Sequence, residues 1–271
     1  MKKKNNQSMS DMQLAFIRRH RRKQLFIWCI RLLILIVFIG GWELLTDRKI
    51  IDSFIFSSPS RIVKAAKLYW VDGTLKHHIG ITLLETFICF GIVIIGGLGV
   101  AIILWWNQTL YKILEPYLVI LNSLPKSALA PVFIVWLGTG MRTIIVAAIS
   151  VAIFGAIMSL YENFKQTDPE KIKLIYTLGG NKLKVLTKLI LPANKAIIIN
   201  VMKVNMGLSL VGVIIGEFVA ANAGLGYLIL YASQVFKLDL VLLSITILSA
   251  VAAVLYLLLD MLERFCLKSS S

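Results

Sequence analysis

The sequence is short of the residues that most enzymes and metal proteins need. Only 16% of its 271 residues are charged, 14 are acidic, and histidine and cysteine occur three times each. The cysteines show no paired spacing, which argues against a disulfide framework and against a metal site. They are Cys29, Cys89 and Cys266. The histidines lie outside the apolar segments and are predicted to be solvated surface residues: His20, His77 and His78.

Motifs for nucleotide chemistry are also missing. No Gly-Lys-Ser/Thr follows the glycines of segment 79–106 and no strand precedes them, so close helix packing explains these glycines better than phosphate binding. The acidic residues within apolar segments, Glu43, Glu85 and Glu217, are scattered along the sequence. We therefore predict a protein that is not an enzyme and needs no cofactor. If ATP drives it, another subunit must hydrolyse that ATP.

Long apolar runs dominate what is present. The chain is 58% hydrophobic with a mean hydropathy of +0.81, which predicts an integral membrane protein. Six runs are long enough to cross a hydrocarbon core of about 30 Å. They cover residues 25–45, 79–106, 111–137, 141–160, 193–221 and 238–262. The expected fold class is an all-α membrane protein with about six transmembrane helices.

The net charge of +15 does not indicate nucleic-acid binding, because the basic residues lie mostly at the ends of the apolar runs. Anionic lipid and membrane topology favour basic residues at these positions. Lysines and arginines are dense in 1–24 and around 168–192, whereas the loop at 46–78 breaks the trend. Both termini are therefore expected in the cytoplasm. The predicted divisions are a basic cytoplasmic tail at 1–24, a first transmembrane helix at 25–46 and a transmembrane domain at 59–265.

Three connections, 46–78, 138–142 and 222–237, are expected on the opposite side of the membrane, and two of them carry structural signals. In the first, Pro59 or Ser60 offers a helix start, and a short helix at the membrane surface follows. The second, 222–237, is predicted to be a loop in which Gly224 and Gly226 turn the chain.

The third apolar run is predicted to be broken. Pro125 and Pro131 lie six residues apart, with Ser123 and Lys126 beside them. Proline removes backbone hydrogen bonds that lipid cannot replace, so such a break must face protein or a water-filled cavity. We predict that these residues line or gate a transport path together with Glu217, whose carboxylate is costly in a membrane helix. The alternative is a simple kink in which Lys126 extends to the headgroups.

The stretch 168–192 carries no run apolar enough for lipid. Its apolar residues recur at helical spacings with lysines between them, and Gly179-Gly180 interrupts the pattern. This predicts two short amphipathic helices that meet at a glycine turn and end at Pro192.

Several motifs in this order resemble a known family. Leu178-Gly179 and Leu191-Pro192 match the second half of the cytoplasmic signature of ATP-binding-cassette importer permeases, and LPKSALAPVFIVWLGTG, DPEKIKLIYTLGG and GEFVAANAGLGYLI resemble the sulfonate/taurine/nitrate branch. The resemblance implies the type I permease fold, a homodimer, cytoplasmic ATPase subunits and an extracytoplasmic solute-binding lipoprotein. The Glu-Ala-Ala of the signature is replaced by Lys173-Leu174-Ile175, and Glu85 stands where a basic or neutral residue is expected.

The expected function is thus the permease subunit of an importer for a small solute such as a sulfonate, taurine, nitrate or a vitamin precursor, in the bacterial inner membrane. A secondary transporter or channel without an ATPase partner is the alternative, although it would not explain the segment 168–192. The residues that the resemblance assigns to the ATPase contact are Glu170, Lys173, Ile175, Tyr176, Leu178, Gly179, Gly180 and Pro192. The sequence does not identify the solute.

Overall fold

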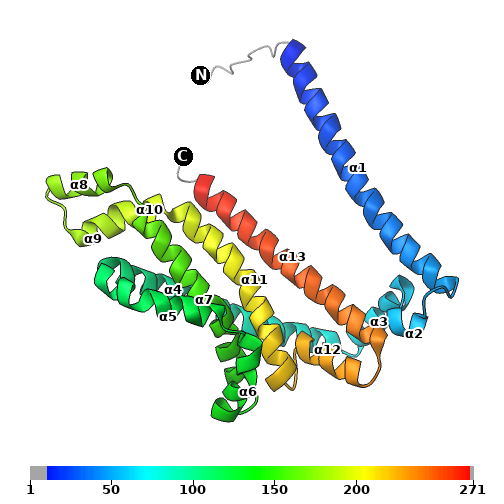
Figure 1. Ribbon diagram of the computed structural model, residues 1–271. Helices are drawn as coiled ribbons and strands as arrows, with labels where there is room; N and C mark the ends of the chain where they lie inside the picture. Colours follow the sequence, from blue (N-terminus) through cyan, green and yellow to red (C-terminus); the bar gives the residue numbers. More distant parts are fainter. Residues whose placement is uncertain (1–10, 269–271) are drawn as a thin grey trace. The chain divides into compact units, whose positions relative to one another are not determined.

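The computed structural model describes residues 11–268, and every regular element in that range is helical (Figure 1). The chain divides into two compact units, Met1–Lys64 and Ala65–Ser271. The elements are α1 (Asp11–Asp47), α2 (Ser53–Phe56), α3 (Pro59–Val71), α4 (Thr74–Trp106), α5 (Gln108–Ser123), α6 (Lys126–Leu137), α7 (Met141–Lys165), α8 (Pro169–Thr177), α9 (Lys182–Val185), a π-helical turn η1 (Leu186–Ile190), α10 (Leu191–Ala193), α11 (Lys195–Ala220), α12 (Leu225–Gln234) and α13 (Leu238–Lys268).

The first unit is built on α1, whose stretch Arg22–Asp47 is apolar and long enough to span a membrane. None of its most apolar window is buried within this chain. Beyond α1 the backbone is held by side chains: Thr46 Oγ1 donates to Ser57 O at 3.3 Å, and Ser60 N donates to Glu43 Oε2 at 3.0 Å. These contacts place the start of α3 at Pro59, as the sequence predicts.

The second unit has its core between α4, α7 and α11. Helix α7 packs against both of the others, and small residues let the backbones approach closely. A Cβ atom at Gly212 of α11 would lie only 2.7 Å from Ala148 Cα of α7, and one at Gly216 would lie 2.9 Å from Ile144 Cα. The Gly-x-x-x-Gly spacing in α11 is therefore a real packing face, in which larger side chains would force the two helices apart.

The predicted break in the third run is confirmed. Helices α5 and α6 meet at an angle of 95°, with Leu124 and Pro125 between them in extended conformations. A second proline, Pro131, lies inside α6. Within residues 11–268, five single helices are long and apolar enough to span a membrane, and the bent α5–α6 pair makes six if it counts as one span. This confirms the all-α fold class and the approximate number of spans.

One predicted loop is wrong. Residues 222–237 were expected to lack regular structure, but Leu225–Gln234 form α12. Gly224, which precedes α12, has a φ of +119° and supplies the expected turn. Gly226 lies instead within the first turn of the helix. The apolar residues of α12 form a run too short to be recognised as a separate helix. Neither the length nor the periodicity of this run distinguishes it from a loop between two spans.

Candidate functional site

The segment 168–192 begins with a capped helix. Asp168 is the N-cap of α8, and its Oδ1 accepts a hydrogen bond from Glu170 N at 2.9 Å, while Pro169 occupies the first helical turn, where its missing N–H costs nothing. Because these signals are local, they fix the start of α8 without tertiary contacts.

The glycine turn that ends α8 is a Schellman motif. Gly180 N donates to Ile175 O at 2.8 Å and Gly179 N donates to Tyr176 O at 3.0 Å, and Gly179 has the left-handed φ of +76° that this motif requires. Gly180 is needed for a different reason, because a Cβ there would lie 2.6 Å from Ile175 O. Both glycines of the predicted turn are thus explained by the backbone.

Helix α8 and its C-cap expose three large apolar side chains. Leu174, Tyr176 and Leu178 are 57%, 47% and 76% exposed, whereas Ile175 is half-buried and packs against the main core. Of the residues assigned to the ATPase contact, Tyr176 and Leu178 are therefore exposed and Ile175 is not. The sequence reasoning missed Leu174, whose side chain is among the most exposed of the segment.

The remaining assigned residues lie elsewhere in the segment 168–192. Glu170 and Lys173 are exposed on α8, and Lys173 O accepts a hydrogen bond from Thr177 Oγ1 at 3.0 Å. Pro192 is exposed in α10, directly after the π-helical turn. The helical run does not end at Pro192 as predicted, because the break falls two residues later, at Asn194.

Asn194 closes the segment onto its own beginning. Its side chain is buried, and Nδ2 donates to Thr167 Oγ1 at 3.0 Å and to Ile190 O at 2.9 Å. Thr167 directly precedes α8, so one side chain ties the entry of the segment to its exit and to the start of α11. Nothing in the sequence distinguishes this asparagine from a surface residue.

The second half of the segment is anchored to the core. Lys182 Nζ donates to Trp106 O at 2.5 Å and lies 5.6 Å and 5.4 Å from the ring centres of Trp105 and Trp106. Val185 and Ile190 are fully buried a turn or two later. A lysine over two indole rings combines a charge-assisted hydrogen bond with cation–π attraction. Helix α9 is therefore fixed to the α4–α5 corner, while α8 projects from it.

The broken α5–α6 segment is largely open on the surface of this chain. Ser123, Pro125 and Pro131 are exposed, and Lys126 is half-exposed. Ser123 Oγ donates to Val119 O at 2.9 Å, and Lys126 Nζ bonds Asn122 O, so both side chains fold back onto the backbone ahead of the break.

Glu217 lies in a different environment, inside a buried polar cluster. It is 1% exposed, and its two oxygens accept hydrogen bonds from Thr82 Oγ1 at 2.7 Å and from Gly226 N at 2.5 Å. Thr82 Oγ1 in turn accepts from Leu225 N at 2.7 Å. The carboxylate thus satisfies backbone donors at the start of α12, where the helix dipole also favours negative charge. No contact joins it to Lys126, and a role for either in a path stays a prediction.

The same cluster corrects two expectations from the sequence. Glu85 and Glu217 are not scattered but form a hydrogen-bonded pair, with Glu85 only 2% exposed. His78, expected on the surface, is buried, and its Nδ1 accepts from Gly224 N at 2.9 Å. Residues more than 130 positions apart meet here, so no local sequence pattern could have predicted the cluster.

The cluster also explains the glycines of the turn. A Cβ at Gly224 would lie 2.2 Å from Glu217 Oε1, and one at Gly226 would lie 2.9 Å from Glu217 Cβ. Any larger residue at either position would therefore displace the carboxylate from its donors.

A second charged group within the apolar helices was missed. Lys203 of α11 bonds both Asp260 and Glu263 of α13, at 2.7 Å from the Asp260 carboxylate, and its side chain is 9% exposed. The sequence reasoning did not single out Lys203, although it lies well inside a span. Since the lysine is paired with both carboxylates, this group ties α11 to α13.

Within residues 11–268, no three His, Cys, Asp or Glu side chains are placed so that they could hold a metal ion.

The sequence is similar to those of several transport permeases. The chain is 29% identical over 237 residues to a probable ABC transporter permease protein of Haemophilus influenzae, covering 86% of this chain and 95% of that protein. It is 26% identical to a formylaminopyrimidine transport permease protein of Halalkalibacterium halodurans, covering 69% and 74%. It is 25% identical to the taurine transport system permease protein of Escherichia coli, covering 85% and 86%.

The fold also has a solved counterpart. A chain of the MetNI methionine ABC transporter in an inward-facing conformation matches with a TM-score of 0.63 at 18% identity, covering 73% of this chain and 97% of that one. Residues 92–267, which include α5–α6, the segment 168–192 and the turn before α12, match the model of the binding-protein-dependent transport system inner membrane component family. The chain therefore belongs to this family of multi-pass inner-membrane proteins, the permease subunits of ATP-binding-cassette importers.

Proposed function

We propose that two copies of this permease subunit form the path for a small organic solute, and that a separate ATPase drives the path through the segment 168–192. The solute reaches the opposite side on a solute-binding protein. Relatives are named for formylaminopyrimidine and taurine, which supports a sulfonate, taurine, nitrate or vitamin-precursor type of solute. The dense basic residues of 1–24 and 168–192 support a cytoplasmic position for both.

The exposed apolar side chains of α8 and its C-cap carry this proposal. They lie in the connection between the spans that end at Lys165 and begin at Lys195, outside both of them. Leu174 and Leu178 lie one turn apart on one side, and Tyr176 is exposed on the other side of the helix. Large exposed apolar side chains on both sides of a short helix favour a protein partner that buries the helix in a groove.

The attachment of the segment supports transmission of force. Helix α8 is joined to α9 by the rigid Schellman turn, α9 is bound to the α4–α5 corner through Lys182, and Asn194 ties the segment to the start of α11. A partner that moves α8 would therefore move the ends of the membrane helices with it, as in a shear or hinge movement of packed helices.

The α5–α6 break supports the position of the path. Lipid cannot satisfy a backbone interrupted at Leu124 and Pro125, so this surface must face protein or water. In a dimer, facing copies would bring Ser123, Lys126 and Pro131 to a shared cavity. Glu217 is buried and does not line the path. It would act on the gate indirectly, because it holds the turn before α12 in place.

Transport by the reconstituted complex tests the function. The permease is placed in proteoliposomes with its cognate ATPase and solute-binding protein, and uptake of candidate solutes is measured with and without ATP. ATP-dependent uptake supports the proposal. Uptake that proceeds without the ATPase would instead identify a secondary transporter or channel.

The α8 contact is tested by co-purification. Tyr176→Ser combined with Leu178→Ser should reduce the recovered ATPase at least tenfold, because an apolar contact of two large side chains is removed. Lys184→Ser is the control, an exposed lysine of α9 rather than of α8, and should retain the ATPase. Equal recovery from both variants would refute α8 as the contact.

A further inference from the structure

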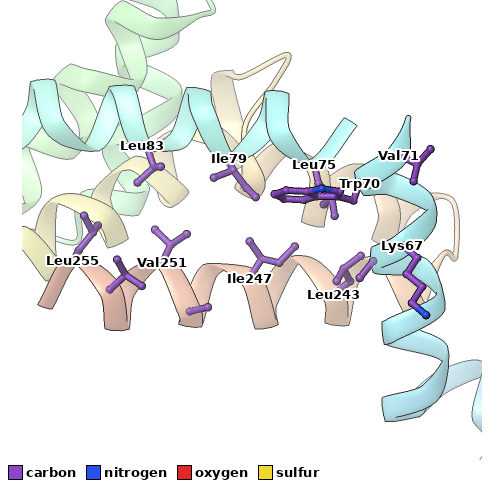
Figure 2. Close-up of a pocket in the computed structure, with 13 residues that line it drawn as sticks. Lys67, Trp70, Val71, Leu75, Ile79, Leu83, Leu243, Ile247, Val251 and Leu255 are labelled. Carbon is purple, nitrogen blue, oxygen red and sulfur yellow. The ribbon is translucent and has the colours of Figure 1, made fainter. Parts of the chain in front are cut away.

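A long apolar groove runs along the second unit (Figure 2), and no residue of α5, α6 or α8 lines it. Its volume is about 760 Å³, and three helices form it: α3 at one end, with α4 and α13 as the two walls. The walls are aliphatic, with Ile79 and Leu83 on α4 facing Ile247 and Val251 on α13 (Figure 2). Both walls belong to helices that are apolar and long enough to span the membrane.

One end of the groove has the character of a membrane surface. Trp70 of α3 points into the space between α4 and α13 beside Leu75, and Lys67 stands at the same end (Figure 2). Lys76 Nζ lies 5.0 Å from the ring centre of Trp70. Tryptophan and lysine together mark the headgroup level of a bilayer. No ion pair forms at Lys67 or Lys76 among the described residues, so both ammonium groups are available to an anion.

The other end is apolar and closed. Leu83 and Val251 pack there against a cluster of Met206, Leu210 and Leu255, in which α11 fills the space between α4 and α13. A ligand in this groove would therefore have a polar end at Trp70 and an apolar end at Leu255.

The dimensions select among possible occupants. The groove follows α13 from Leu243 to Leu255, about 18 Å at 1.5 Å per residue, which matches about one half of a hydrocarbon core of roughly 30 Å. A helix that spans the membrane crosses the whole core, about twice this length, whereas an acyl chain of one leaflet ends near the middle of the core.

We propose that this groove binds one anionic phospholipid, with its acyl chains between α4 and α13 and its phosphate at Lys67 and Lys76. Apolar burial alone gives no preference for the groove over bulk lipid, since lipid tails are as apolar as the walls. Selectivity must come from the two ammonium groups, which together favour an anionic over a zwitterionic headgroup roughly ten- to thirtyfold.

Lipid retention tests the proposal on the full chain. The protein is reconstituted with equal amounts of phosphatidylglycerol and phosphatidylcholine, extracted into mild detergent, and weighed by native mass spectrometry. We expect one phospholipid per subunit, with phosphatidylglycerol preferred at least tenfold. Lys67→Gln combined with Lys76→Gln should abolish the preference and leave a phospholipid bound. Random retention of both lipids by the wild type would overturn the proposal.

Filling the groove tests its location. Ala250→Trp places a bulky ring in the groove and should abolish retention, whereas Ala253→Trp adds the same ring at an exposed position of α13 outside the groove and should not. Equal retention by the two variants would contradict the proposal.

A photoreactive side chain at Ile247 identifies the occupant directly, even if the tryptophan variants fail to fold. A phospholipid adduct supports the proposal. An adduct to α1 or to a second copy of the chain would show that protein occupies the groove instead.

Discussion

The pair formed by Glu85 and Glu217 gives the sharpest prediction, because the two carboxyl groups share one buried site and yet should respond differently to the same substitution. Neither forms an ion pair among the described residues, and two carboxylates in contact away from water cannot both be charged. Glu217 bonds Gly226 N and Thr82 Oγ1, which favours its charged form. Glu85 Oε2 has no partner, so Glu85 is the better candidate for the neutral member.

The cost of each change follows from the donors left behind. Glu217→Ala leaves Gly226 N–H and the Thr82 hydroxyl without an acceptor, at about 1–3 kcal/mol each. Glu217→Gln keeps one oxygen as an acceptor but turns an NH₂ group towards the other donor. It should therefore destabilise the protein by about half as much as Glu217→Ala. Glu85→Gln replaces a neutral carboxyl by a neutral amide of the same shape and should cost less than about 1 kcal/mol. The expected order of destabilisation is Glu217→Ala, then Glu217→Gln, then Glu85→Gln.

The assay is the temperature of half-maximal unfolding of the purified protein in detergent, together with uptake by the assembled complex. At about 2–4 °C per kcal/mol, Glu217→Ala should lose roughly 5–20 °C and Glu85→Gln less than about 4 °C. Uptake should fall with Glu217→Gln and stay near the wild-type rate with Glu85→Gln. The reasoning is refuted if Glu85→Gln destabilises as much as Glu217→Gln, or if Glu217→Ala unfolds at the wild-type temperature.

Three further changes test the segment 168–192. Gly180→Ala should weaken ATPase binding more than tenfold with normal membrane levels, because its Cβ would meet Ile175 O at 2.6 Å and open the Schellman turn; wild-type binding would exclude a role for the turn. Lys182→Met should lower uptake several-fold while the ATPase still binds, since only the anchor to Trp106 is lost, and unchanged uptake per bound ATPase would exclude the anchor. Single cysteines at Asn181 and Asn222, in a cysteine-free chain, should label from opposite sides of the membrane, and labelling of both by an impermeant reagent on intact cells would refute the proposed topology.

Much of the fold could be predicted because its signals are local. Apolar length locates the spans, the Pro125 break follows from backbone chemistry, and Asp168 and Gly179 bound α8 through contacts within a few residues. Helix α12 was missed because its apolar pattern merges with the neighbouring spans.

The site was harder to predict because its contacts join distant parts of the chain. His78 was taken for a surface residue and Glu85 for an isolated acid, although both meet the turn before α12 across more than 130 positions. Leu174 stands where the family signature has an alanine, so a comparison of motifs does not identify it as a contact residue. Its side chain is 57% exposed in the structure, which does identify it as a candidate. Asn194 gives no sequence signal, since its role depends on Thr167 returning beside it.

Helix α11 connects the two functional regions. Its first residue follows Asn194, which is bound to the segment 168–192, and its last turn holds Glu217, which is bound to the turn before α12. At 26 residues it spans about 39 Å, and the close contact at Gly212 leaves it stiffly packed on α7. A displacement of α8 can therefore reach the far turn through a shift of this helix, and the two ends should be energetically coupled. A double-mutant cycle of Asn194→Ala and Glu217→Gln measures that coupling in uptake, and strictly additive effects would show that the two ends act independently.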